Sequence, residues 1–213
     1  DASAISFAAL QCANKLGKIP AAALESQLQK CGVEEYVLRC ALAGDYLLGG
    51  MNVPKCTVIT LKDLKPVEGY PPFPLHTKQP VYVIGKARPA ADFPTDHPTC
   101  SSVHAMFLLT LTSLRNASAD DAISAIVAKA KTSSSSSAVA GSAPFPRALT
   151  TKELDATFAE YSLALEWHVV DLGSTNGTAL NDDRLQPMQL EAILNEDVLQ
   201  FGQSSRKYFV SAQ

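Results

Sequence analysis

The sequence predicts a mainly β protein, in which a β-sandwich carries a long insertion and follows a small α-helical extension. Short stretches rich in β-branched and aromatic residues recur after residue 50, and Gly, Asn, Asp and Pro punctuate them. Such strands favour a sandwich or barrel over alternating β-α units. Hydrophobic residues make up 46% of the 213 residues and charged residues 18%, so most of the chain can bury a core.

The first region, residues 1–50, is expected to form the helical extension. Apolar residues recur at helical spacing from Ile5 to Leu16. Pro20 stands where a first helical turn tolerates proline, and Gly32 ends that second helix. Glu34–Leu42 is expected to form a third short helix. Three helices this short do not make a solenoid, so we expect them to pack on a neighbouring part of the chain or on a partner.

The second region, residues 51–73, combines one strand with a proline-rich connector, and residues 74–213 are expected to form the body of the sandwich. Period-2 patterns and β-branched residues mark the strands. The expected strands are Cys56–Leu61, Val81–Ile84, Met106–Leu111, Trp167–Val170, Asp197–Phe201 and Lys207–Val210.

The stretch of about residues 113–161 interrupts this β pattern. It holds a helical run at Asp120–Lys131, a serine-rich run at Thr132–Ser137, and a second helix that starts at a Thr150-x-x-Glu153 capping box. Loops this long are uncommon inside compact domains, so we interpret the stretch as an insertion between two strands. The serine run is interpreted as a flexible spacer, with a phosphorylation site as the alternative.

Composition excludes several classes of protein. The net charge of -3 argues against a general nucleic-acid-binding surface, and no apolar run approaches the ~20 residues that span a bilayer. The five cysteines are scattered without a C-x-x-C pair, which indicates neither a zinc site nor a disulfide framework and favours a reducing, intracellular compartment. We expect no cofactor and no metal.

The chain begins with Asp1 and shows no secretory signal, so we expect a processed form or a portion of a longer protein.

Three short segments place polar and cationic residues directly before or after predicted strands. Loops that gather at one end of a sandwich and present hydroxyls, amides and cations suit a phosphate group on a peptide. No G-x-x-x-x-G-K-[ST] motif is present, so nucleotide binding has no support. The residues are Gly85, Lys86 and Arg88; Ser101, Ser102 and His104; and Gly173, Ser174, Thr175, Asn176 and Gly177.

In this order, Gly85-Lys86, Ser101–His104 and Asp171–Thr178 resemble the signature of forkhead-associated (FHA) domains: Gly-Arg, Ser-x-x-His and Gly-Ser-x-Asn-Gly. The resemblance covers about residues 74–112 and 162–212. It implies an eleven-stranded β-sandwich that reads phosphothreonine through loops at one end.

A narrower resemblance lies in Ala91–Ser101 and Phe201–Tyr208, which look like a nuclear branch of the family. Fungal members of this branch belong to the pre-mRNA retention and splicing complex.

The resemblance also implies a role for each site residue. Lys86 takes the place of the phosphate-binding arginine, and Ser101 is expected to bind the phosphate. Thr175 and Asn176 are expected to hold the peptide, while Gly85, His104, Gly173 and Gly177 shape the loops. Two residues depart from the family pattern: Lys86 offers a point charge instead of a guanidinium fork, and Ser102 replaces a second cation. Arg88 is the residue expected to compensate.

The sequence therefore predicts a phosphothreonine-peptide-binding adaptor in a larger nuclear complex, with pre-mRNA splicing as its setting. Its partners are a phosphorylated protein or peptide and the protein subunits of that complex; neither a membrane nor direct nucleic-acid binding is expected. The alternative is a degenerate FHA scaffold that binds partners independently of phosphate through its helical extension and insertion. We do not expect an enzyme, because no acidic residue is placed by motif to orient His104 beside Ser101 or Cys100.

Overall fold

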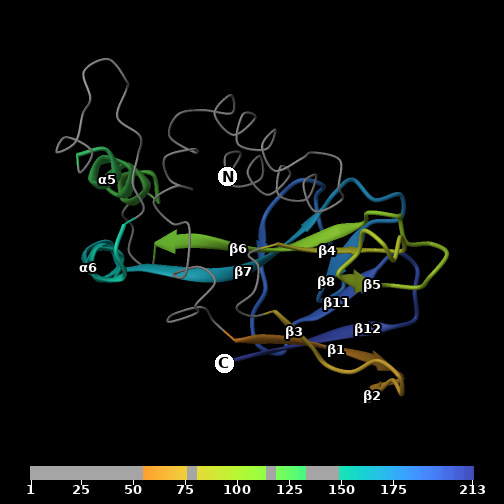
Figure 1. Ribbon diagram of the computed structural model, residues 1–213. Coiled ribbons are helices and arrows are strands. Elements are labelled where there is room, and N and C mark those ends of the chain that lie inside the picture. The colour runs from red at the N-terminus through yellow and green to blue at the C-terminus, as the bar shows by residue number, and fades with distance from the viewer. Residues whose placement is uncertain (1–54, 76–80, 114–118, 133–148) are drawn as a thin grey trace. The chain divides into compact units, whose positions relative to one another are not determined.

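The computed structural model describes residues 55–75, 81–113, 119–132 and 149–213 (Figure 1). The predicted helical extension of residues 1–50 and the serine-rich run lie outside these ranges. The chain divides into two compact units. The first includes Val53–Thr110 and Glu166–Gln213, and the second includes Leu111–Leu165. No helix among the described residues is both long and apolar enough to cross a membrane.

The first unit contains two β-sheets. One sheet has the strand order β2-β1-β12-β11-β8-β9, with β3 also paired to β1, and the other has the order β10-β7-β6-β4-β5. The first sheet consists of β1 (Cys56–Lys62), β2 (Lys65–Pro66), β3 (Phe73–Leu75), β8 (Thr178–Leu180), β9 (Asp183–Arg184), β11 (Val198–Phe201) and β12 (Lys207–Ala212). The second consists of β4 (Val81–Gly85), β5 (Phe93–Pro94), β6 (Ala105–Ser113), β7 (Leu163–Asp171) and β10 (Glu191–Ala192).

Burial patterns explain why these sequences form these strands. Along β1 every second residue is buried, as expected of a strand with one face on a core and one toward solvent. All five residues of β4 are buried, which matches its uninterrupted apolar sequence. Phe93 of the second sheet packs on Tyr208 of the first with ring centroids 5.3 Å apart, so the two sheets share one core. The predicted β-sandwich is confirmed.

The first sheet reaches further toward the amino terminus than the domain boundary predicted at residue 74. Strand β1 pairs antiparallel with β12 from Cys56↔Ala212 to Leu61↔Lys207. The proline-rich connector then turns the chain back, so that β3 pairs with β1 on its other edge. The first sheet thus pairs a strand that precedes the connector with the last strand of the domain.

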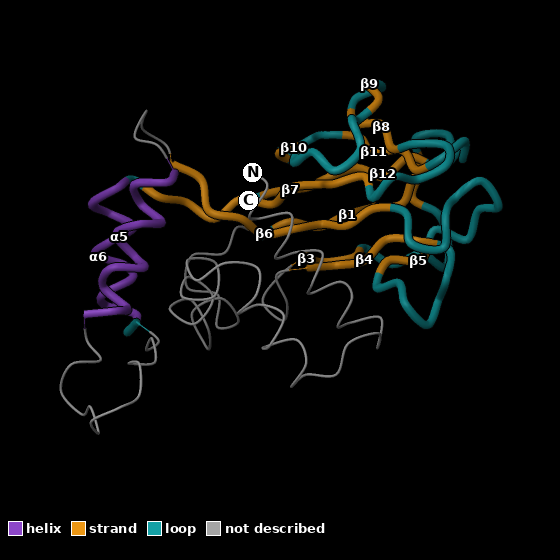
Figure 2. Tube along the Cα trace, turned by 90° about the horizontal axis from the view of Figure 1, so that it is seen from above, coloured by secondary structure: helices purple, strands orange, loops and turns teal. Residues whose placement is uncertain are grey.

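The described part of the second unit holds helices α5 (Ala119–Thr132) and α6 (Thr151–Tyr161), drawn side by side in Figure 2. The predicted capping box is confirmed at the start of α6: the Glu153 backbone N–H donates to Thr150 Oγ1, and Glu153 Oε2 accepts from the Thr150 N–H. Lys129 of α5 donates from Nζ to Thr157 Oγ1 of α6 over 2.8 Å. The buried side chains of the pair include Ile126, Val127, Ala130, Leu154 and Phe158.

Candidate functional site

The first two predicted loops run side by side through backbone hydrogen bonds. The Lys86 N–H donates to the Ser101 carbonyl oxygen over 3.0 Å, and the Ala87 N–H donates to the Ser102 carbonyl oxygen over 3.1 Å. Gly85 is required for this approach, because a Cβ there would overlap the carbonyl oxygen of Ser102. Glycine at the end of β4 therefore allows the backbone at Lys86 to run beside the loop of Ser101 and Ser102.

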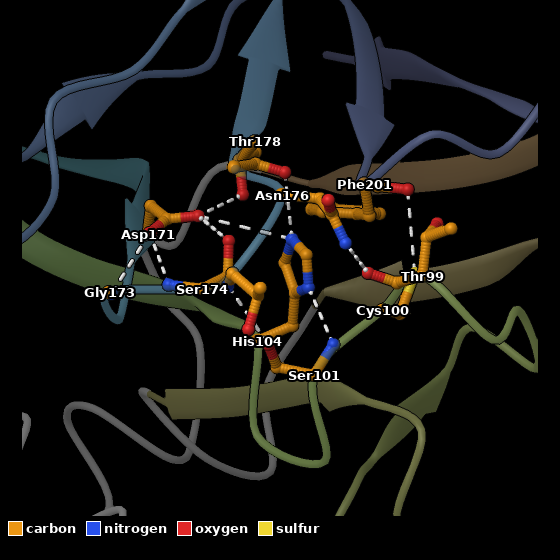
Figure 3. A network of polar contacts seen from close by, with 12 residues as sticks. Thr99, Cys100, Ser101, His104, Asp171, Gly173, Ser174, Asn176, Thr178 and Phe201 are labelled. Carbon is orange, nitrogen blue, oxygen red and sulfur yellow. Dashed lines mark hydrogen bonds and ion pairs between the residues drawn. The ribbon is translucent and has the colours of Figure 1, made fainter.

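The third loop is bonded to the second loop through Ser101 and Asn176 (Figure 3). The Thr175 N–H donates to Ser101 Oγ over 3.2 Å. Asn176 Nδ2 donates to the carbonyl oxygen of Thr99 over 2.7 Å. Because these bonds connect residues more than 70 positions apart, the fold itself gathers the three loops at one end of the sandwich.

His104 is fully buried between the second and third loops. Its Nδ1 accepts from the Ser101 N–H over 3.0 Å, and its Nε2 lies 3.0 Å from the carbonyl oxygen of Gly177. An imidazole that accepts at Nδ1 and donates from Nε2 is neutral. Burial agrees with this, since it lowers the pKa of His104 below the usual 6.5 despite the nearby Gly177 carbonyl and Asp171.

Asp171 fixes the shape of the third loop from its base. Its Oδ1 accepts from the N–H groups of Gly173 and Ser174, and its Oδ2 accepts from the hydroxyls of Ser174 and Thr178. Burial by itself would raise the pKa of Asp171, but these hydrogen bonds outweigh it and the pKa lies below the usual 3.8. Asp171 belongs to the predicted motif, yet the sequence assigned it no part in the site. A carboxylate at the first position of a tight turn is the signal that marks it.

A fourth segment, not predicted as part of the site, also meets these loops. The Gln203 N–H donates to Thr99 Oγ1 over 2.9 Å, and Gln203 Nε2 lies 3.5 Å from Asn176 Oδ1. The Gly202 N–H donates to the Gly177 carbonyl oxygen. The turn between β11 and β12 thus supports both the Thr99 and Asn176 sides of the site.

The cations of the site differ in how they are paired. Lys86 is exposed, and its Nζ lies 3.5 Å from the carbonyl oxygen of Pro98. Arg88 forms an ion pair with Asp96, with 2.7 Å between Nη2 and Oδ2. Arg184 packs its guanidinium on Gly177, where a Cβ would lie 2.7 Å from Arg184 Nε. Arg88 therefore has a carboxylate partner, whereas Lys86 has none among the described residues.

Cys100 does not have the properties of a nucleophile. Its thiol is buried and donates to the Phe201 carbonyl oxygen over 3.4 Å. Burial raises the pKa of this thiol, although Thr95 and Lys86 act in the opposite direction. Within the described ranges, no group of three His, Cys, Asp or Glu residues could hold a metal ion.

Comparison with known proteins identifies the sandwich. Residues 155–202 match the family model of the FHA domain. This chain contains an FHA domain. It is 30% identical over 131 residues to Smad nuclear-interacting protein 1 of Mus musculus, an alignment that covers 62% of this chain and 24% of the mouse protein. It is 27% identical over 137 residues to the FHA domain-containing protein DDL of Arabidopsis thaliana, covering 64% of this chain and 31% of that protein.

Among solved structures, full-length yeast Pml1p is similar with a TM-score of 0.47 and 14% identity, covering 82% of this chain and 96% of that one. The chain spans less than a third of the length of the two curated relatives. The predicted resemblance to FHA domains and to the Smad nuclear-interacting branch is confirmed.

FHA domains are phosphopeptide-binding interaction modules. In the FHA domain of this protein, Lys86, Ser101, Thr175 and Asn176 stand on loops joined directly by hydrogen bonds. Ser102 is exposed in the same loop as Ser101 and contributes a backbone acceptor. The predicted contribution of Arg88 stays a prediction, and the structure adds a carboxylate partner that the sequence did not indicate.

Proposed function

We propose that this protein binds phosphothreonine peptides through the loop end of its FHA domain and acts as an adaptor in a larger nuclear assembly. The observation that carries the proposal is the meeting of three loops at Ser101. Its Oγ accepts from the Thr175 N–H, and its carbonyl oxygen accepts from the Lys86 N–H. A hydroxyl, a backbone amide and an ammonium-bearing residue from three separate segments thereby adjoin one another.

Charge and hydrogen bonding explain how such a site discriminates. A phosphothreonine carries about -1.5 to -2 charges and three acceptor oxygens, so it gains charge-assisted hydrogen bonds that plain threonine cannot make. Lys86 supplies a mobile point charge where an arginine would supply a two-point fork. We therefore expect a modest affinity.

Similarity to relatives supports the setting of this activity. The mouse relative is named as a nuclear protein that interacts with Smad proteins. Residues 91–101 and 201–208 resemble the FHA branch found in the pre-mRNA retention and splicing complex. On these grounds we propose protein subunits of a nuclear splicing assembly as partners.

A second function is favoured by the limited positive charge at two described positions of the site. Ser102 stands where a second cation is common, and Asp96 neutralises Arg88. An FHA scaffold that binds partners without phosphate, through residues 1–50 and the insertion, is the alternative that these two observations support.

The deciding experiment compares two degenerate peptide libraries that differ only in a fixed phosphothreonine or threonine. The best phosphopeptide and its unphosphorylated twin are then titrated by calorimetry. Lys86→Arg should tighten binding of the phosphopeptide, whereas Ser101→Ala or Asn176→Ala should weaken it by roughly one to two decades, the equivalent of ~1.5–3 kcal/mol for a lost charged hydrogen bond.

The matched control is Ser211→Ala, which removes a hydroxyl from β12 near the opposite end of the strand from the Gly202–Gln203 turn. Its affinity should equal that of the native protein. Equal affinity of the native protein for the two peptides would rule out phosphate reading and leave the scaffold function.

A further inference from the structure

Arg88 and Asp96 form a two-point pair at the surface of the domain. Arg88 Nε donates to Oδ1 over 3.1 Å, and Nη2 donates to Oδ2 over 2.7 Å. This is the geometry in which a guanidinium also binds two oxygens of a phosphate. The Arg88 side chain is 71% exposed and that of Asp96 is 23% exposed, so solvent reaches the cation more freely than its partner.

The carboxylate of Asp96 is held in place by its backbone and by a third segment of the chain. Asp96 has a φ of 46°, in the left-handed region that Asp and Asn tolerate better than most residues. Tyr70, in the proline-rich connector, donates its hydroxyl to Asp96 Oδ2 over 3.2 Å. Arg206 lies over the Tyr70 ring, 4.5 Å from its centroid. The hydrogen bond from Tyr70 therefore helps to hold the Asp96 carboxylate against Arg88.

The pair lies on the same two loops as Lys86 and Ser101, two of the proposed phosphate ligands. Asp96 directly precedes the turn whose Pro98 carbonyl accepts from Lys86 Nζ and whose Thr99 carbonyl accepts from Asn176. Arg88 is two residues beyond Lys86, in the loop bonded to Ser101 and Ser102. A phosphate seated between Lys86 and Ser101 would thus lie on the two loops that carry the Arg88 guanidinium and the Asp96 carboxylate.

We infer that Asp96 is an internal competitor of the phosphate: it occupies the Arg88 fork in the free protein and opposes the ligand's negative charge. The inference rests on the proposed function and names a residue that sets the affinity of that same site. Lys86, Arg88 and Asp96 together carry a net charge of +1, where the two cations alone would carry +2. A bound phosphopeptide must draw Arg88 from Asp96 or do without it.

The test is Asp96→Asn, which removes the charge and keeps the size, the tolerance of a left-handed φ and an acceptor for Tyr70. It should tighten binding of the selected phosphothreonine peptide roughly tenfold, as expected for one additional charged hydrogen bond, and leave the unphosphorylated twin unchanged. The matched control is Glu196→Gln. It removes one negative charge at another left-handed position (φ 73°), on the turn bonded to Val210 and away from the site end of β12.

A double-mutant cycle with Arg88→Gln assigns the gain to Arg88. In the native background this change should weaken phosphopeptide binding, because it leaves the Asp96 charge uncompensated, but by less than in the Asp96→Asn background. In the Asp96→Asn background it should remove most of the tenfold gain. If the tenfold gain in affinity persists in the Arg88→Gln background, the inference is overturned. The gain would then come from the change in the net charge of the protein and not from Arg88.

A measurement on the native protein does not depend on any variant folding. The Nε–Hε resonance of Arg88 in a nitrogen–proton correlation spectrum should shift on saturation with the phosphopeptide and stay in place with the unphosphorylated twin. No shift on saturation, together with no gain in Asp96→Asn, would overturn the competitor role while a preference for phosphopeptide keeps the proposed function. If neither the native protein nor Asp96→Asn prefers the phosphopeptide, both proposals fail. A preference that appears only in Asp96→Asn supports the competitor role and overturns phosphate reading by the native protein.

Discussion

At the scale of single residues, two buried groups keep the loops of the FHA domain in position through their protonation states. His104 bridges Ser101 and Gly177 as a neutral imidazole, and a second buried histidine, His168, also has a pKa lowered by burial. The pKa of Asp171 is lowered by its hydrogen bonds from Ser174 and Thr178, which outweigh its burial. These groups make stability depend on pH in two separate windows.

The sign in each window follows from which state binds more protons. A histidine with a folded pKa below 6.5 binds protons more readily when unfolded, so stability falls as the pH drops below about 6.5. Asp171 contributes fully above 3.8 and loses its contribution as the pH falls from there toward its lower folded pKa. Between pH 7 and pH 5 the loss therefore belongs to the histidines.

We predict that the free energy of unfolding falls between pH 7 and pH 5, by up to ~1.4 kcal/mol per pH unit for each histidine. His104→Gln should lower stability at pH 7.5 by ~1–3 kcal/mol, because the Ser101 N–H loses its acceptor, and should flatten the slope. Urea unfolding at pH 7.5, 6.5 and 5.5 measures both effects, with His168→Gln as the comparison. An unchanged slope in His104→Gln would contradict the assignment.

At the scale of elements, the sequence predicted the strands and helices that have a local residue pattern. It missed the short strands that are defined only by pairing with a neighbouring strand. The strands at Val81–Gly85 and Lys207–Ala212 follow from their β-branched patterns, and the start of α6 follows from its capping box. Two-residue strands such as β9 and β10 carry no such pattern, because only their hydrogen bonds to a neighbouring strand define them.

The site shows the same division. Its ordered motif predicted the loops of Lys86, Ser101 and Asn176. The Asp96 partner of Arg88 and the contact of Gln203 with Thr99 come from side chains and turns that only the folded chain brings together.

The insertion provides the prediction at this scale. The boundaries between the two compact units fall within β6 and β7, and α5 packs on α6. Replacing residues 114–162 with a short Gly-Asn-Gly turn should leave the sandwich folded and keep phosphopeptide affinity within about twofold, because β6 and β7 are already neighbours in one sheet. Far-ultraviolet circular dichroism and calorimetric titration measure the two outcomes.

A second deletion, of residues 118–150, serves as the comparison. It removes α5 but leaves α6, whose Leu154 and Phe158 are buried in the intact protein. Exposure of these side chains should lower solubility. If the longer replacement also abolishes cooperative unfolding, the insertion is part of the core of the sandwich.

At the scale of the whole molecule, the FHA domain is assembled from both sides of the insertion and from both ends of its described chain. Ser101 precedes the insertion and Thr175 follows it, yet the two are hydrogen-bonded. Strand β1 pairs with the last strand, β12, and the Gln213 N–H donates to the Lys55 carbonyl oxygen. A ligand that contacts all three loops therefore depends on the folding of the entire sandwich.

This dependence predicts how a phosphopeptide alters global stability. Trp167, the only tryptophan in the sequence, is buried in β7 and packs on Tyr82, so its fluorescence reports the core of the sandwich. At a free concentration of about 100 times its Kd, the phosphothreonine peptide should raise the free energy of unfolding by ~2.7 kcal/mol, because it binds the folded state and not the unfolded chain. Urea unfolding followed by Trp167 emission measures the shift.

The unphosphorylated twin at the same concentration should produce a much smaller shift, and Ser101→Ala should reduce the effect of the phosphopeptide in proportion to its loss of affinity. A phosphopeptide that binds by calorimetry but leaves the Trp167 transition unmoved would show that it binds outside the cooperatively folded sandwich.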